Sequence, residues 1–270
     1  MQLASFLRAI TIMRIILVFL GKMFRLFMFL YSYSNSKMTN PEHYSACDCH
    51  CSACEDNHCE ECSCCDCGES YDCNNCARIE RIVPNFKLTM YNPHSQEIEN
   101  KTVKDYRNKW LVLFFYPADF TFVCPTELKD LNQKAEEIRA MGDVEVFGVS
   151  VDSVFSHKSW LESEEMLKGF QFNMISDRNT VLSRYFGILN TATGNAERGT
   201  FIISPDGVLK TIEVHTDAVG RSAKELVRKL YGLKFVTENK GHACPASWEN
   251  NMKTMQPNIK NAGHAGATLS

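Results

Sequence analysis

The cysteines of this chain fall into two groups that suggest different chemistry. Eleven of the thirteen lie between Cys47 and Cys76, whereas Cys124 and Cys244 each stand alone in the rest of the sequence. A thiol can act as a nucleophile, a disulfide partner or a metal ligand, and its surroundings decide which. The neighbours of each group therefore indicate its expected role.

The crowded group contains Cys-x-x-Cys pairs, a spacing with which two sulfurs of one tight turn can bind a zinc ion. Cys51 with Cys54, and Cys73 with Cys76, are the candidate zinc ligands. Other pairs in the group overlap, which fits no fixed zinc finger and favours a loose, metallothionein-like or redox-buffering segment. The alternative is an unstructured tail whose thiols have no role.

Composition divides the chain into four parts. Residues 1–38 form a basic, apolar leader without acidic residues, and residues 39–78 form a Cys-rich segment with nine acidic residues and no large aliphatic side chain. Such a segment cannot bury enough apolar surface to fold on its own. Residues 79–239 have the composition of a globular domain, and residues 240–270 form a polar C-terminal arm that contains Cys244.

The leader has three interpretations. Four of its basic residues, Arg8, Arg14, Lys22 and Arg25, interrupt every apolar run before it reaches the ~18–20 residues of a membrane span. On a helix they fall within roughly 120°, which predicts a basic amphipathic helix for a membrane surface or organelle targeting. A secretory signal anchor is the second interpretation. In the third, translation starts at Met38, and the protein is then expected in the cytoplasm.

The globular part predicts an α/β protein. The net charge of the whole chain, −3, argues against nucleic acid as a main partner. Continuous apolar runs predict buried strands, and apolar residues at helical spacing predict helices between them. The expected strands are 110–117, 144–152 and two within 201–214; the expected helices are 128–142, 157–167 and 222–232, the last stopped by Gly232. This order suits a thioredoxin-like fold with a central mixed β-sheet flanked by helices.

In this layout Cys124 follows the end of a central strand and begins the next helix. A helix N-terminus presents unpaired N–H groups and a partial positive charge, which favour a thiolate over a thiol. Pro125 fits the first helical turn. The alternative is that Cys124 is a small, buried core residue, and its position alone leaves the two interpretations evenly balanced.

The surrounding motifs indicate a family. FYPADFTFVCPTE, which contains Cys124, resembles the peroxiredoxin active-site loop, with the pattern P-x-x-x-T-x-x-C. FGVSVDSVFSHKSW, ERGTFIISPDG and HACPASW resemble further peroxiredoxin segments in the same order. The match covers about residues 79–248 and is to the typical two-cysteine class, which includes the bacterial alkyl hydroperoxide reductase C and thiol-specific antioxidant proteins. The resemblance implies a thiol-dependent peroxidase that reduces hydrogen peroxide and organic hydroperoxides.

The resemblance also implies roles for five residues of the site. Cys124 attacks the peroxide, and Thr121 donates to the thiolate and orients the peroxide. Arg198 stabilises the thiolate and the developing oxyanion, and Glu127 holds Arg198 through charge-assisted hydrogen bonds. Pro117 shields the sulfur from water. In the simpler alternative, Thr121 only caps the helix and Arg198 is a solvated charge at a strand end.

The sixth implied residue is Cys244, which matches the resolving cysteine of the class. The implied product is a Cys124–Cys244 disulfide between the two chains of a homodimer, and such dimers often assemble into decamers. Thioredoxin or a dedicated disulfide reductase would reduce this disulfide back to two thiols. Catalysis would require no cofactor. Cys244 could instead be a passive tail thiol.

The rival function is a metal-binding or chaperone-like protein on a peroxiredoxin scaffold, with zinc in the Cys-rich segment and membrane contact only if the leader is retained.

Overall fold

The computed structural model describes residues 76–264, apart from the side chain of Asn261. The predicted leader and most of the Cys-rich segment, with the candidate zinc ligands Cys51, Cys54 and Cys73, lie outside these residues. Within residues 76–264 no helix has the length and apolar character needed to cross a membrane. The same residues contain no group of His, Cys, Asp and Glu side chains arranged to hold a metal ion.

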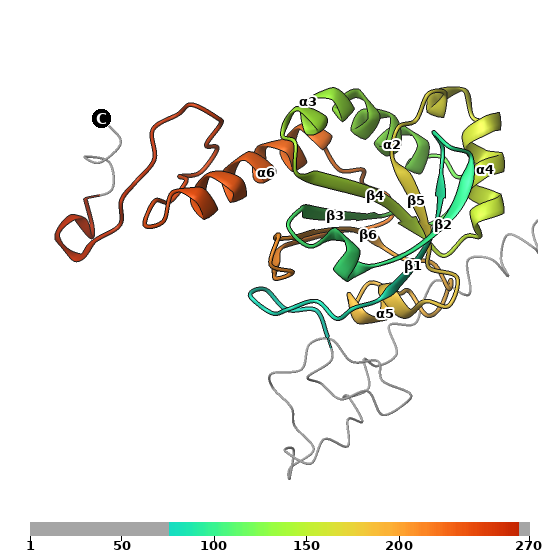
Figure 1. Ribbon diagram of the computed structural model, residues 1–270, viewed down its shortest axis with the longest axis horizontal. Helices are drawn as coiled ribbons and strands as arrows, with labels where there is room; N and C mark the ends of the chain where they lie inside the picture. The colour runs from blue at the N-terminus through green and yellow to red at the C-terminus, as the bar shows by residue number, and fades with distance from the viewer. Residues whose placement is uncertain (1–75, 265–270) are drawn as a thin grey trace, which may run out of the picture. The chain divides into compact units, whose positions relative to one another are not determined.

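Seven strands form one mixed sheet in the order β2-β1-β5-β4-β3-β6-β7 (Figure 1). The three parallel strands β3, β4 and β5 lie at its centre, and every other neighbouring pair is antiparallel. The α/β, thioredoxin-like fold with a central mixed sheet is thus confirmed. The strands are β1 (Lys87–Asn92), β2 (Glu97–Thr102), β3 (Trp110–Phe115), β4 (Val144–Ser150), β5 (Asn173–Ser176), β6 (Arg198–Ile203) and β7 (Leu209–His215).

Helices cover both faces of this sheet. Figure 1 shows α2, α3, α4 and α6 on one face and α5 on the other. Every residue of β3 is buried because alternate side chains face these two layers: Val112 and Phe114 pack with the first, Leu113 and Phe115 with the second. The helices are α2 (Cys124–Gln133), α3 (Ala135–Ala140), α4 (Val154–Ser163), α5 (Val181–Tyr185) and α6 (Ala223–Glu238), with 3-10 turns at Val103–Tyr106, Glu165–Leu167 and Ile259–Asn261.

Three predicted helices differ from those observed. The expected helix over 157–167 is observed as α4, which ends at Ser163, and a separate 3-10 turn at Glu165–Leu167. The expected single helix over 128–142 is two helices, α2 and α3, that meet at Lys134, whose ψ of 2° departs from helical geometry. The predicted stop of the last helix at Gly232 is wrong, because α6 continues to Glu238. Phe235 packs on Trp248 with ring centroids 5.2 Å apart. This packing offsets the modest cost of a glycine inside the helix.

Candidate active site

The loop between β3 and α2 carries the candidate nucleophile. It turns at Phe120, a bulky residue in the left-handed region (φ 56°), which is an uncommon and strained conformation. Helix α2 then starts at Cys124, and the preceding Val123 makes no side-chain capping hydrogen bond. Cys124 itself is fully buried. The loop thus combines local strain with an uncapped helix start at the buried thiol.

Arg198 meets Cys124 across the sheet. The antiparallel pairing of β3 with β6 sets Phe114 opposite Thr200, and this register brings the start of β6 to the loop after β3. Arg198 Nη1 lies 3.4 Å from Cys124 Sγ and donates to Glu127 Oε2 at 2.6 Å. Glu127 is three residues after Cys124 in α2, so both side chains lie on one helix face. Three of the predicted site residues are therefore in direct contact.

Arg221, which no sequence motif indicated, completes this ion pair. Its backbone N–H and Nε both donate to Glu127 Oε1, at 2.8 and 2.9 Å, and its Nη1 donates to the Gly199 carbonyl oxygen at 2.8 Å. The guanidinium also stacks 3.6 Å from the centre of the Phe114 ring. One feature of the sequence could have indicated Arg221. A cation just before a helix start is unfavourable because it opposes the helix dipole, which suggests that Arg221 pairs with a negative charge elsewhere.

The charges of this cluster are almost entirely buried. The residue exposures of Arg198, Glu127 and Arg221 are 2%, 3% and 7%. Two guanidinium groups face one carboxylate, so the buried charges balance when Cys124 is a thiolate. A second carboxylate, that of Asp217, accepts a hydrogen bond from Arg198 Nη2 at 3.0 Å. Asp217 is largely exposed, so solvent screens its charge.

The pKa shifts follow from this geometry. Burial raises the pKa of Glu127, but the hydrogen bonds and charge of Arg221, with the charge of Arg198, outweigh it and leave the pKa below its ordinary value. Burial lowers the pKa of Arg198, but its hydrogen bond to Cys124 and the charge of Glu127 outweigh that effect, so the pKa is raised. Burial dominates at Arg221 and lowers its pKa.

Two other predicted residues lie in the loop itself. Pro117 is buried two residues after the end of β3. The Thr121 hydroxyl donates to the Ala118 carbonyl oxygen at 2.9 Å, within the loop. Its proton is therefore used inside the loop in this conformation, while the lone pairs of the hydroxyl oxygen stay available as acceptors.

Cys244 lies on the C-terminal arm, which packs along the second half of α6. Its sulfur is 3.9 Å from the Gly232 carbonyl oxygen, and Arg228 Nη1 donates to the Trp248 carbonyl oxygen at 3.1 Å. Burial raises the pKa of Cys244, and the nearby Arg228 charge opposes that effect. The start of α6 faces α2, because Ala223 N–H donates to Asp130. Gly232 is nine residues further along, roughly 14 Å along the helix axis.

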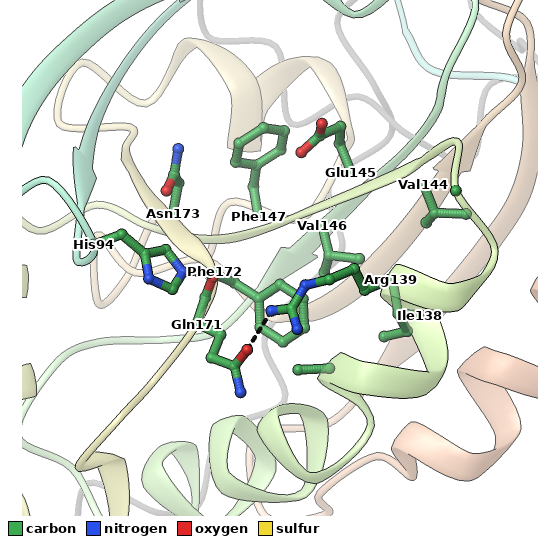
Figure 2. A pocket seen from close by; sticks show the side chains of 12 residues that line it. His94, Ile138, Arg139, Val144, Glu145, Val146, Phe147, Gln171, Phe172 and Asn173 are labelled. Atoms are coloured by element: carbon green, nitrogen blue, oxygen red, sulfur yellow. Dashed lines mark hydrogen bonds between the residues drawn. The ribbon is translucent and has the colours of Figure 1, made fainter.

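A pocket of about 310 Å³ lies at the opposite end of the sheet, among the first residues of β4 and β5. Figure 2 shows His94, Arg139 and Gln171 on its polar side, with Arg139 bonded to Gln171. Cys124 follows the other, carboxyl end of the parallel strands. This pocket therefore takes no part in the chemistry of the thiol.

Comparison with known proteins gives consistent matches. A sequence model of the AhpC/TSA family matches residues 79–212, which include Cys124 and Arg198. Alkyl hydroperoxide reductase C of Staphylococcus aureus is 41% identical over 184 residues, which make up 68% of this chain and 96% of that protein.

Solved structures give the same result. The crystal structure of Enterococcus faecalis AhpC is 38% identical with a TM-score of 0.59, over 63% of this chain and 99% of the other. Reduced Plasmodium vivax 2-Cys peroxiredoxin is 26% identical with a TM-score of 0.63, over 67% of this chain and 94% of the other. The similarity thus extends over almost the whole length of each of these proteins.

Proposed function

This chain belongs to the AhpC/TSA family and is a peroxiredoxin, a thiol-dependent peroxidase, and from that premise we propose that Cys124 is its reacting thiol. The Cys124 thiolate attacks the terminal oxygen of R–O–O–H. A sulfur–oxygen bond forms, the oxygen–oxygen bond breaks, and the RO⁻ that leaves takes a proton from solvent to become ROH. The sulfur is oxidised to sulfenic acid, the first step of cysteine oxidation. Peroxiredoxins require no cofactor for this reaction.

The surrounding residues would each contribute one physical effect. Arg198 stabilises the thiolate and then the negative charge that develops on the leaving oxygen, as a preorganised donor does. Glu127 fixes the orientation of Arg198, and Arg221 fixes Glu127. Thr121 would accept from the peroxide through its free lone pairs, and Pro117 would keep bulk water from the sulfur.

We propose that Cys244 returns Cys124 to a usable state. Its thiol attacks the Cys124 sulfenic acid, a disulfide forms and water leaves, and a dithiol reductant of thioredoxin type or a dedicated disulfide reductase then reduces the disulfide to two thiols. Within one chain, Cys244 packs against Gly232, well along α6 from the end that faces α2. This separation supports a disulfide between the two chains of a homodimer. Dimers could assemble further into decamers.

The remaining segments would be accessory. We propose that residues 79–239 form the catalytic domain and residues 240–270 the resolving arm, in the cytoplasm. The leader (1–38) and the Cys-rich segment (39–78) add targeting, metal-binding or redox-buffering properties. Nothing in the described residues favours the rival metal-binding or chaperone-like function.

The observation that carries the proposal is the contact between Arg198 and the buried Cys124 sulfur at 3.4 Å. Its test is peroxide turnover with a dithiol reductant. Cys124→Ser should abolish turnover. Cys244→Ser should allow the first oxidation but prevent formation of a disulfide-linked dimer. Non-reducing electrophoresis would detect that dimer. Cys76→Ser, a change at a cysteine outside the site, serves as the control and should retain activity. Turnover by the Cys124→Ser protein would overturn the proposal.

A further inference from the structure

Asp217 adjoins the Cys124 site, and its carboxylate is exposed although the groups around it are buried. Its side chain is 72% exposed, whereas that of its partner Arg198 is 2% exposed. The other carboxylate that pairs with Arg198, that of Glu127, is buried. Within residues 76–264, Arg198 is the only cation within ion-pair distance of Asp217. An incoming molecule can therefore meet the negative charge of Asp217 directly.

The end of β7 places Asp217 beside Arg198. The antiparallel pairing of β6 with β7 sets Arg198 opposite His215, the last residue of β7. The chain then turns, and the Val219 N–H donates to the Thr216 carbonyl oxygen at 3.1 Å. Arg198 Nε donates to the backbone carbonyl oxygen of Asp217 at 2.7 Å, and Nη2 donates to its carboxylate at 3.0 Å. The backbone thus supplies one contact, and the side chain supplies the other together with a negative charge.

The buried groups of the site do not balance the charge of Asp217. Arg198 and Arg221 carry two positive charges. Glu127 and the Cys124 thiolate carry two negative charges, so these four groups together are neutral. Asp217 adds a further negative charge. The reactive form of the site is therefore negative overall, although a guanidinium lies beside its sulfur.

The Asp217 carboxylate lies close enough to the sulfur to affect a peroxide that arrives there. A single guanidinium connects the two, because Arg198 Nη1 is 3.4 Å from Cys124 Sγ and Nη2 is 3.0 Å from the carboxylate. The carboxylate is thus within about 10 Å of the sulfur, which is about one Debye length at 0.1 M salt. An exposed charge at this range attracts or repels a charged molecule as it approaches.

We propose that Asp217 is a specificity-determining residue whose carboxylate disfavours anionic hydroperoxides and so selects uncharged ones. Hydrogen peroxide and uncharged organic hydroperoxides meet no net repulsion, whereas a hydroperoxide that carries a carboxylate approaches a site of its own sign. Without the Asp217 carboxylate the remaining charges balance, and this discrimination is lost. The inference rests on the proposed function, because it concerns the peroxide that Cys124 attacks.

One substitution separates the charge of Asp217 from its contacts. In Asp217→Asn the amide oxygen can still accept from Arg198 Nη2, and the backbone carbonyl contact is unaffected. The variant therefore removes the negative charge while the guanidinium keeps its acceptors. Asp217→Glu is the conservative variant, since it retains the charge on a longer side chain.

The control variant is Glu97→Gln, which also removes an exposed carboxylate. Glu97 lies on the edge strand β2, four strands away from β3 in the sheet. At the usual spacing of neighbouring strands, this is roughly 19 Å. The charge of Glu97 should therefore have little effect on a peroxide at Cys124.

Two matched peroxides report the charge effect: a short aliphatic hydroperoxide with a terminal carboxylate, and the methyl ester of the same molecule. Each is mixed in excess with the reduced full-length protein, without reductant, and quenched at set times with a thiol-alkylating reagent. Mass spectrometry of the Cys124 peptide then gives the rate at which this thiol is lost, separately from the other cysteines. The quantity compared is the ratio of the rate constant for the anionic peroxide to that for the ester.

At about 10 mM salt, where the Debye length is about 30 Å, Asp217→Asn should raise this ratio about twofold to threefold over the wild type. The increase should disappear at about 1 M salt, where the Debye length is about 3 Å. Asp217→Glu and Glu97→Gln should each stay within about 1.5-fold of the wild-type ratio at the lower salt concentration.

An unchanged ratio in Asp217→Asn at low salt, or an increase that persists at high salt, would overturn the proposal. A purely structural role of Asp217 would change the rates of both peroxides equally and leave their ratio unchanged. Failure of the proposed function would look different. Neither peroxide would then oxidise Cys124 of the wild type faster than a cysteine in a short peptide, and the inference would fall with it.

Discussion

One nitrogen of Arg198 contacts both the Cys124 sulfur, at 3.4 Å, and the Glu127 carboxylate, at 2.6 Å. The remaining nitrogens are occupied as well, because Nε and Nη2 both donate to Asp217. The guanidinium fork is thus fixed on three sides, with its charge beside the Cys124 sulfur.

Arg198→Lys should therefore slow peroxide reduction strongly although it retains the positive charge. A lysine has one nitrogen on a flexible stem and cannot contact Cys124, Glu127 and Asp217 together. We expect kcat/KM for peroxide to fall by about 10²–10³, as for other preorganised donors. Stopped-flow measurement of the first oxidation tests this, with Arg139→Lys as the control at an exposed position. A loss below about tenfold would show that charge alone suffices.

Arg221→Met should lower stability more than it lowers the rate. Glu127 would lose both hydrogen bonds from the Arg221 side chain and keep the one from the backbone N–H of residue 221. Arg198 would then be the only guanidinium paired with this buried carboxylate. Removal of one partner from a buried ion pair costs about 3 kcal/mol or more. Urea unfolding of the reduced protein measures the change. The double variant Arg221→Met/Glu127→Gln should recover part of the loss, and an additive double variant would contradict the coupling.

The ion pair should also make stability depend on acid pH. The pKa of Glu127 is below its ordinary value of 4.5, so its contribution is fully present above about pH 4.5 and is lost as the pH falls through the lowered value. Glu127→Gln should be less stable at neutral pH and should show a shallower decline in acid. Glu225→Gln is the matched control, since Glu225 also has a lowered pKa but is partly exposed and screened. An unchanged acid profile in Glu127→Gln would exclude this contribution.

The central part of the fold was predictable because burial there leaves a strong pattern. Strands β3 and β4 are continuous apolar runs, and β6 and β7 flank a recognisable turn. The three missed strands lack such a run: β1 (KLTMYN) mixes apolar and polar residues, β2 (EIENKT) is a polar edge strand, and β5 has only four residues. Their pairing is set by tertiary contacts that local sequence does not encode.

The site was predictable only in part, for a similar reason. Motif resemblance pointed to Cys124, Arg198 and Glu127, and the sheet register brings them into contact. Arg221 belongs to no local pattern, because its partner Glu127 lies 94 positions away in the chain. The hydrogen bond of Thr121 within its own loop likewise depends on backbone geometry that side-chain spacing does not reveal.

Helix α6 provides a last prediction, at the glycine where the sequence suggested a stop. Gly232 is inside the helix, and a Cβ there would come no closer than 3.9 Å to Cys244 Sγ or to the Trp248 ring, an ordinary contact. Gly232→Ala should therefore raise the unfolding free energy by about 0.5–1 kcal/mol, because alanine restricts the unfolded chain and favours the helix. The comparison variant is Gly207→Ala, whose left-handed backbone (φ 82°) and overlap with the Arg107 side chain predict destabilisation. Thermal unfolding of both variants measures the contrast. If Gly232→Ala is destabilising, the arm around Cys244 must pack more tightly on α6 than these distances indicate.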